Sequence, residues 1–241
     1  LLGGLAIFLY GMEMMSNGLE LVAGDKLRVV IEKMTSNFFK AILVGTFVTA
    51  IIQSSSATTV MVVGFVNAGL MNIYQAIGII MGANIGTTIT GQLVALNISA
   101  MAPIIAFVGF CLHSFANDKK KASLGQAIMG LGFLFMGMEL MSQAMEPLRD
   151  YPGFVTLMTK FENPLLGVLA GTIITAIIQS SSAALGILQA IANQGVIPLR
   201  SSMYIVFGFN IGTCITSVLS SLGSSKNAKR TALAHVLFNI I

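Results

Sequence analysis

The stretch "TAIIQSSSAT", from Thr49 to Thr58, places a glutamine and three consecutive serines inside a long apolar region. No Asp, Glu, Lys or Arg occurs between Ala41 and Asn117, so these polar residues stand where only oily side chains are expected. A nearly identical stretch, "TAIIQSSSAA", recurs from Thr175 to Ala184. Two polar patches of one kind in apolar surroundings indicate a duplicated chain in which the serines have a role.

The composition is that of an integral membrane protein. Hydrophobic residues make up 55% of the chain, charged residues only 9%, and the mean hydropathy is +0.87, whereas soluble domains are about 25% charged. The apolar runs reach the roughly 20 residues that span a bilayer as a helix. The period-two alternation of an outer-membrane barrel is absent. We therefore expect an all-α, multi-pass protein of the cell (inner or plasma) membrane, with the lipid bilayer as its environment.

A repeat at an offset of 126 residues organises the chain. "GTFVTAIIQSSSA" from Gly45 matches "GTIITAIIQSSSA" from Gly171 at 11 of 13 positions. "GANIGTTIT" from Gly82 matches "GFNIGTCIT" from Gly208 at 7 of 9, and "GMEMMS" matches "GMELMS" at 5 of 6, in the same register. We expect a single transmembrane domain of two repeats, residues 1–123 and residues 124–241, the second C-terminally truncated.

Each repeat contains an apolar segment of unsuitable length for spanning. Residues 38–70 number 33, which as one helix would measure about 50 Å against roughly 30 Å of hydrocarbon. A re-entrant helical hairpin that enters, turns at the serines and returns to the same side fits this length. The corresponding hairpin of the second repeat is residues 164–196.

The count of crossings predicts the relative orientation of the repeats. If the hairpin does not cross, the first repeat crosses three times, at residues 1–22, 73–96 and 100–115. Three is odd, so the second repeat is expected upside down, as in secondary transporters with inverted-topology repeats. The glycine-flanked "GANIGTT" and "GFNIGTC" predict a broken transmembrane helix in each repeat, at residues 73–96 and 198–222.

The basic residues support this topology. They cluster on one predicted side, in loops near residues 25–40, 118–121 and 226–230, and only Arg149, Lys160 and Arg200 fall on the other side. Cytoplasmic loops are enriched in Lys and Arg, so these three loops are expected in the cytoplasm. Basic residues in short loops do not form the single basic face of a nucleic-acid-binding protein, and no nucleic-acid partner is expected.

The turn of each hairpin suits ions. The half-helices that begin just after the serines, near Ala57 and Ala183, present free N–H groups to anions. The half-helices that end near Ile52 and Ile178 present free carbonyls, which suit a small hard cation such as Na⁺. No Lys or Arg lies in the four motifs to balance an anion. Cation–anion symport is therefore favoured over an anion channel, with no transition metal and no other cofactor.

Other readings of the polar residues remain open. Glu13 and Glu139 occupy equivalent positions in predicted spans, where a structural hydrogen bond and a functional site are about equally plausible. His113 and His235 are read as packing or hydrogen-bonding residues. A non-transporting scaffold explains the hydrophobicity but not the polar patches. An enzyme is not expected, because no base accompanies the serines. An intramembrane protease stays as a remote alternative.

The doubled "QSSSATT" and "QSSSAA", each followed by an "N-I-G-T" block, together with "KRTALAHVLFN" from Lys229, resembles the bacterial type II sodium–phosphate cotransporter family. The resemblance implies Na⁺-driven transport of inorganic phosphate by alternating access, with the substrate held at the two hairpin tips near the midplane. The substrate site would comprise Gln53, Ser54, Ser55, Ser56, Gln179, Ser180, Ser181 and Ser182. Sodium-binding or supporting residues would be Thr58, Asn84, Thr87, Thr88, Asn210, Thr213 and Thr216.

The resemblance leaves several points open. A sodium-coupled symporter of another small anion, sulfate or a carboxylate, is the alternative function. Bacterial members often carry a C-terminal soluble regulatory domain, which lies outside this chain, and a homo-oligomer is a further partner to consider. The second repeat has Ala184 where the first has Thr58, and Cys214 where the first has Thr88. The two halves therefore cannot offer identical ligands.

Overall fold

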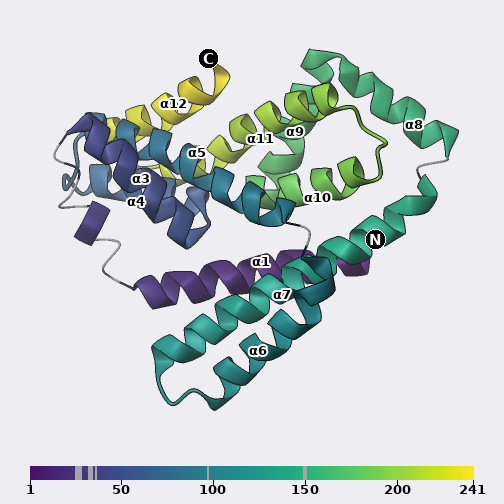
Figure 1. Ribbon diagram of the computed structural model, residues 1–241. Coiled ribbons are helices and arrows are strands. Elements are labelled where there is room, and N and C mark those ends of the chain that lie inside the picture. The colour runs from purple at the N-terminus through teal and green to yellow at the C-terminus, as the bar shows by residue number, and fades with distance from the viewer. Residues whose placement is uncertain (25–28, 32–34, 36, 97, 149–150) are drawn as a thin grey trace.

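The computed structural model describes residues 1–24, 29–31, 35, 37–96, 98–148 and 151–241 (Figure 1). In this part of the chain the secondary structure is helical, with no strand, and the all-α prediction is confirmed. The basic segment near residues 25–40 lies partly outside the described residues, because residues 25–28, 32–34 and 36 are not described, and residues 29–31 are helical.

The helices occur in an order that repeats after 126 residues. The first set is α1 (Leu2–Ala23), α3 (Phe38–Ile52), α4 (Ser55–Asn67), α5 (Ile73–Ala95), η1 (Ser99–Met101) and α6 (Ala102–Phe115). The second set is α7 (Lys119–Met145), η2 (Glu146–Leu148), α8 (Pro152–Thr159), η3 (Lys160–Glu162), α9 (Pro164–Ile178), α10 (Ser181–Asn193), α11 (Leu199–Ser220) and α12 (Lys226–Ile240). The helices α3 and α9 have 15 residues each, and α4 and α10 have 13 each.

The glycines of the "N-I-G-T" blocks serve close helix packing. An added Cβ at Gly82 would lie 2.1 Å from the carbonyl oxygen of Ile42 on α3, and one at Gly208 would lie 2.2 Å from that of Val168 on α9. Only glycine lets the backbones approach so closely, as is common between membrane helices. The break expected in "GANIGTT" and "GFNIGTC" is not present, because α5 and α11 are each one continuous helix.

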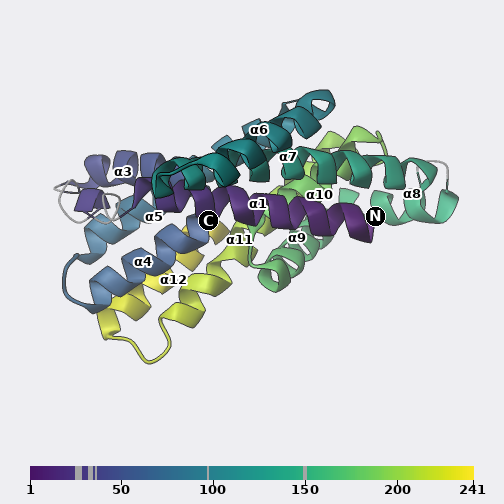
Figure 2. The same ribbon diagram turned by 90° about the horizontal axis from the view of Figure 1, so that it is seen from below.

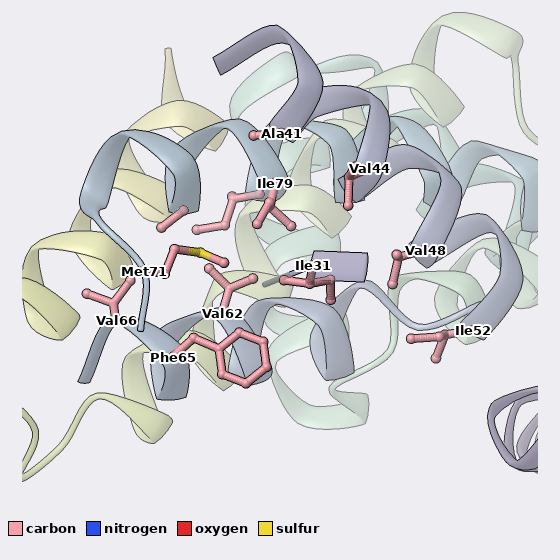
Figure 3. Close-up of a cluster of buried hydrophobic side chains, with 12 residues drawn as sticks. Ile31, Ala41, Val44, Val48, Ile52, Val62, Phe65, Val66, Met71 and Ile79 are labelled. Atoms are coloured by element: carbon pink, nitrogen blue, oxygen red, sulfur yellow. The ribbon is translucent and has the colours of Figure 1, made fainter. Parts of the chain in front are cut away.

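The direction of α4 relative to its neighbours follows from the packing of α3 on α5. Gly45 packs on Ile79 and Gly86 on Ala50, so α3 and α5 run parallel. Because α3 and α5 are parallel and α4 lies between them in the chain, the chain must reverse direction twice, once before α4 and once after it. In Figure 3, Val48 and Ile52 lie on the outgoing helix α3, and Val62 lies on the returning helix α4. Their side chains share one buried cluster, which fixes α4 against both neighbours.

The repeat-related helices α1 and α7 pack on each other reciprocally. A Cβ at Gly11 would lie 2.4 Å from the backbone nitrogen of Leu134, and a Cβ at Gly137 would lie 2.3 Å from that of Phe8. Adding 126 to Gly11 gives Gly137, and subtracting 126 from Leu134 gives Phe8, so the two contacts are equivalent. The later residue of α1 contacts the earlier residue of α7, so the two helices are antiparallel. Figure 2 shows α1 running along the length of the molecule beside α7.

Three described helices are long and apolar enough to cross a membrane, namely α5, α7 and α11. A fourth span results if α8 with η3 and α9, which are bent by 105°, are taken together. The expected spans α1 and α6 are not among them, and the 14 residues of α6 would measure only about 21 Å. Large apolar side chains cover the outer surface, as at Phe39, Phe47 and Ile177, in accord with a lipid environment.

Candidate functional site

The turn at each hairpin tip is made by the glutamine of the QSSS motif. Gln53 (φ 61°) and Gln179 (φ 58°) are the two non-glycine residues of the described chain that adopt the left-handed region. The N–H of Gln53 donates to the carbonyl of Thr49 at 2.7 Å and so ends α3. The same backbone geometry at repeat-related positions shows that both tips are built alike.

The first serine of each motif starts the returning helix. Ser54 Oγ accepts the N–H of Ala57 at 3.1 Å, and Ser180 Oγ accepts the N–H of Ala183 at 3.2 Å. These are N-cap bonds. Each bond satisfies one of the four N–H groups that a helix start leaves free. The N–H groups of the second and third serines of each motif stay available to an anion. α4 and α10 therefore begin within two residues of the predicted Ala57 and Ala183.

The two tips meet each other. Ser56 Oγ donates to the backbone carbonyl of Gln179 at 3.4 Å, across 123 residues of sequence. Ser55 is 7% exposed and Ser182 6% exposed, so each tip also buries one serine. Residues that sequence reasoning assigned to one substrate site are thus neighbours in the structure.

A small cavity joins the second tip to both "N-I-G-T" segments. It measures about 120 Å³, and its polar lining consists of Ser181, Asn84, Thr87, Thr88 and Asn210. The lining therefore combines α5 of the first repeat with α10 and α11 of the second. None of its lining residues is charged.

Three of the predicted supporting residues lie outside this cavity. Thr58 and Thr213 are buried between helices, with 0% and 4% exposure. The hydroxyl of Thr216 donates to the carbonyl of Thr213 within α11 at 2.9 Å. The structure thus brings together four of the seven predicted supporting residues around Ser181.

The threonines that line the cavity keep acceptor capacity for a cation. Thr87 Oγ1 donates to the Ala83 carbonyl at 2.9 Å, and Thr88 Oγ1 donates to the Ile85 carbonyl at 2.7 Å. Because each hydroxyl uses its proton within α5, its lone pairs point away as acceptors. Groups of three or more His, Cys, Asp or Glu that could hold a metal are absent from the described residues. Oxygen ligands of this neutral kind suit Na⁺ rather than a transition metal.

The two glutamines differ in environment although their backbones agree. Gln53 is 6% exposed, and its amide Nε2 donates to the Ala50 carbonyl. Its Oε1 atom is buried without a hydrogen-bond partner. Gln179 is exposed. A buried carbonyl oxygen without a donor is costly, and a bound cation would satisfy it.

A sequence difference between the repeats has a direct structural counterpart. Thr49 Oγ1 donates to Thr58 Oγ1 at 2.9 Å, which ties α3 to α4 at the first tip. In the second repeat Ala184 replaces Thr58, and the equivalent Thr175 Oγ1 is buried without a partner. The second hairpin therefore lacks the bond that closes the first.

Sequence reasoning missed two residues that position the site. Ser16 Oγ of α1 donates to the Ile52 carbonyl at 2.8 Å, at the end of α3 next to the tip. Its place in the repeated "GMEMMS" block was the available signal. Asn239 of α12 accepts from Asn84 Nδ2 at 2.6 Å and donates to the His235 carbonyl at 2.9 Å. Nothing in the sequence pairs residues 84 and 239.

His235 and Cys214 have structural partners, which for His235 agrees with the prediction that it packs or hydrogen-bonds. His235 is 1% exposed, and its Nδ1 atom lies 2.8 Å from Ser217 Oγ. Cys214 is buried against the same helix, with its Sγ atom 3.6 Å from the His235 carbonyl. These contacts hold α12 on α11.

The comparisons with known proteins agree with the resemblance. The family described as Na+/Pi-cotransporter matches residues 7–143 and 151–241. The chain is 36% identical to "Uncharacterized protein YqeW" of Bacillus subtilis, over 97% of this chain and 76% of that protein. It is 28% identical to the Escherichia coli protein named "Putative inorganic phosphate export protein YjbB", over 100% of this chain and 45% of the relative.

A further relative comes from an animal. The rat "Sodium-dependent phosphate transport protein 2A" is 32% identical over 73% of this chain and 29% of its own length. The chain thus spans less than half of the Escherichia coli and rat proteins. No solved structure matches. Since the family match covers nearly the whole chain, including both QSSS tips and both "N-I-G-T" segments, the chain belongs to the Na⁺/Pi-cotransporter family.

Proposed function

We propose that this chain forms the transport unit of a sodium-coupled symporter of inorganic phosphate. It works by alternating access, with the substrate held at the two QSSS tips. The observation that carries the proposal is the meeting of the tips at Ser56 and the Gln179 carbonyl, 3.4 Å apart. Two helix starts and two helix ends lie at these tips, and neither QSSS motif contains Asp, Glu, Lys or Arg. A phosphate would be bound by Gln53, Ser54, Ser55, Ser56, Gln179, Ser180, Ser181 and Ser182.

The site needs a cation as well as an anion. The starts of α4 and α10 offer N–H groups and a positive dipole end to phosphate. No lysine or arginine lies in the QSSS and N-I-G-T motifs to offset the anion's charge, which would be costly away from water. Sodium ions would offset it, with the oxygens of Asn84, Thr87, Thr88 and Asn210, which line the 120 Å³ cavity, as supporting ligands.

The packing supports an inverted arrangement of the repeats. The repeat-related α1 and α7 are antiparallel and contact each other reciprocally at Gly11 and Gly137. If both cross the membrane, the two repeats enter it from opposite sides. The parallel α3 and α5 support a hairpin that re-enters, because a single span in its place would make them antiparallel. The basic loops at 118–121 and 226–230 then face the cytoplasm.

The relatives support the substrate more directly than the direction of transport. The rat protein is named for sodium-dependent phosphate transport and the Escherichia coli protein for phosphate export. We take the direction of net phosphate flux to follow from the Na⁺ gradient and the membrane potential. Two sodium ions, each moving down a tenfold gradient and about 100 mV, release about 7 kcal/mol. Moving a divalent anion against the same potential costs about 4.6 kcal/mol.

The test is uptake of radiolabelled phosphate into proteoliposomes that contain the purified protein, with and without an inward Na⁺ gradient. We expect uptake that depends on the gradient and is lost when K⁺ replaces Na⁺. Equal uptake under both conditions would refute the coupling. If an excess of unlabelled sulfate or of a dicarboxylate abolishes the uptake of phosphate, that anion would be favoured as the substrate instead.

A further inference from the structure

A polar cavity lies at the end of α10 that is remote from the hairpin tip. It measures about 420 Å³, and its lining includes Glu139, Ser142, Gln189, Asn193 and Ser99. The helix from Ser181 to Asn193 has 13 residues, which places the cavity about 18 Å from the tip. It is therefore separate from the candidate phosphate site and takes in residues to which the proposed function gives no role.

The charge pattern of this cavity favours a cation. Glu139 is the acidic residue of the lining, and the described lining residues include no Lys, Arg or His. The carboxylate accepts one hydrogen bond, from Gln143 Nε2 at 3.0 Å. Ala95 and Asn193, the last residues of α5 and α10, also line the cavity, so two helix C-termini add their negative dipole ends. The hydroxyl and amide oxygens supply neutral ligands.

The equivalent place in the first repeat is closed by a hydrogen bond. Asn67 Oδ1 accepts the backbone N–H of Ser225 at 2.8 Å. Addition or subtraction of 126 converts this pair to Asn193 and Ser99, the same two residue types, which line the cavity instead of bonding to each other. One of two repeat-related entrances is thus open and the other shut. The same pair of residue types is thus bonded in one half of the chain and lines an open cavity in the other.

We propose that this cavity is an entrance subsite for a monovalent cation, bound through the Glu139 carboxylate, on the face opposite the basic loops. The proposal rests on the proposed function for its physiological ion, Na⁺, and for the side of the membrane. In that topology the open cavity faces the exterior, where Na⁺ is abundant. The pair Asn67–Ser225 then closes the cytoplasmic side.

The first experiment measures the cation preference of the cavity without any transport. A cysteine replaces Asn193 in a Cys111→Ser background, because the remaining Cys214 is only 2% exposed. The rates of reaction with a cationic and an anionic methanethiosulfonate reagent are compared in low salt. We expect the cationic reagent to be favoured, and Glu139→Gln to lower the rate ratio by up to about 25-fold, because one unit charge at about 4 Å in water changes each rate about fivefold and in opposite directions. The matched control is Glu13→Gln, the repeat counterpart, which should leave the ratio unchanged.

The second experiment connects the cavity to transport. Glu139→Gln should raise the Na⁺ concentration for half-maximal phosphate uptake about fivefold, while the phosphate concentration for half-maximal uptake at saturating Na⁺ stays the same. An unchanged rate ratio in the thiol experiment would overturn the cation subsite even if the parent protein transports phosphate with Na⁺. Conversely, a parent without Na⁺-dependent uptake would refute the proposed function, while the thiol experiment still judges the cavity.

Discussion

Moving one hydroxyl between the two hairpins tests how the tips are held. In the first repeat Thr49 Oγ1 donates to Thr58 Oγ1 at 2.9 Å. In the second repeat Ala184 offers no such partner, and Thr175 Oγ1 is buried and unpaired. We therefore expect Thr58→Ala to destabilise the protein, because it removes the partner of Thr49, and Ala184→Thr to stabilise it, because it supplies a partner to Thr175.

The magnitudes follow from the burial of these groups. Thr49 is 0% exposed, and a buried hydroxyl left without a partner costs about 1–3 kcal/mol. Hydrogen bonds between membrane helices average about 0.6 kcal/mol, with a maximum near 1.7, so Thr58→Ala should cost about 1–2 kcal/mol. For Ala184→Thr we expect a gain of about 0.6 kcal/mol. A cavity of about 200 Å³ borders Ala184 and has room for the two added atoms.

The assay is the free energy of unfolding in detergent micelles, without Na⁺ and phosphate, so that ligand binding does not enter. Thr59→Ala is the matched control, because Thr59 is equally buried but donates only to the Ser56 carbonyl within its own helix at 3.1 Å. The difference between the variants at positions 58 and 59 isolates the bond between helices. Equal losses at the two positions, or a destabilising Ala184→Thr, would refute this account of the tips.

Three further predictions test the packing, the site and the topology. Gly82→Ala should cost about 1–3 kcal/mol of unfolding free energy, because its Cβ would lie 2.1 Å from a carbonyl of α3, whereas Gly64→Ala, with nothing within 4 Å, should not destabilise; similar losses would contradict the packing role. Ser55→Ala should weaken phosphate binding about tenfold or more, as loss of a hydrogen bond to a charged ligand does, with a nearly unchanged melting curve; normal affinity would place the site elsewhere. A cysteine at Lys120 should react with impermeant reagents only from the cytoplasm and one at Lys160 only from outside, and labelling from the same side would disprove the inverted arrangement.

The sequence by itself predicted those features that depend on few neighbouring residues. Composition and the lengths of apolar runs indicated helices in a membrane, and the repeat at 126 residues located both halves. The end of α3 and the start of α4 followed from the QSSS motif. Gln53 ends one helix and Ser54 caps the next through bonds to residues three or four positions away. Such capping chemistry is local, so it can be read from a short stretch.

Tertiary structure decided the features that depend on partners far along the chain. The glycines of "GANIGTT" predicted a break, yet Gly82 lies in a continuous helix, because what a glycine does depends on the backbone that packs against it. The two tips are nearly identical in sequence, yet Gln53 is buried and Gln179 exposed, since each is surrounded by different helices. The contact between Ser56 and the Gln179 carbonyl joins residues 123 positions apart. Only the packing of all the helices brings such groups together. Capping and periodicity act over a few residues and carry no information about contacts between residues so far apart in the sequence.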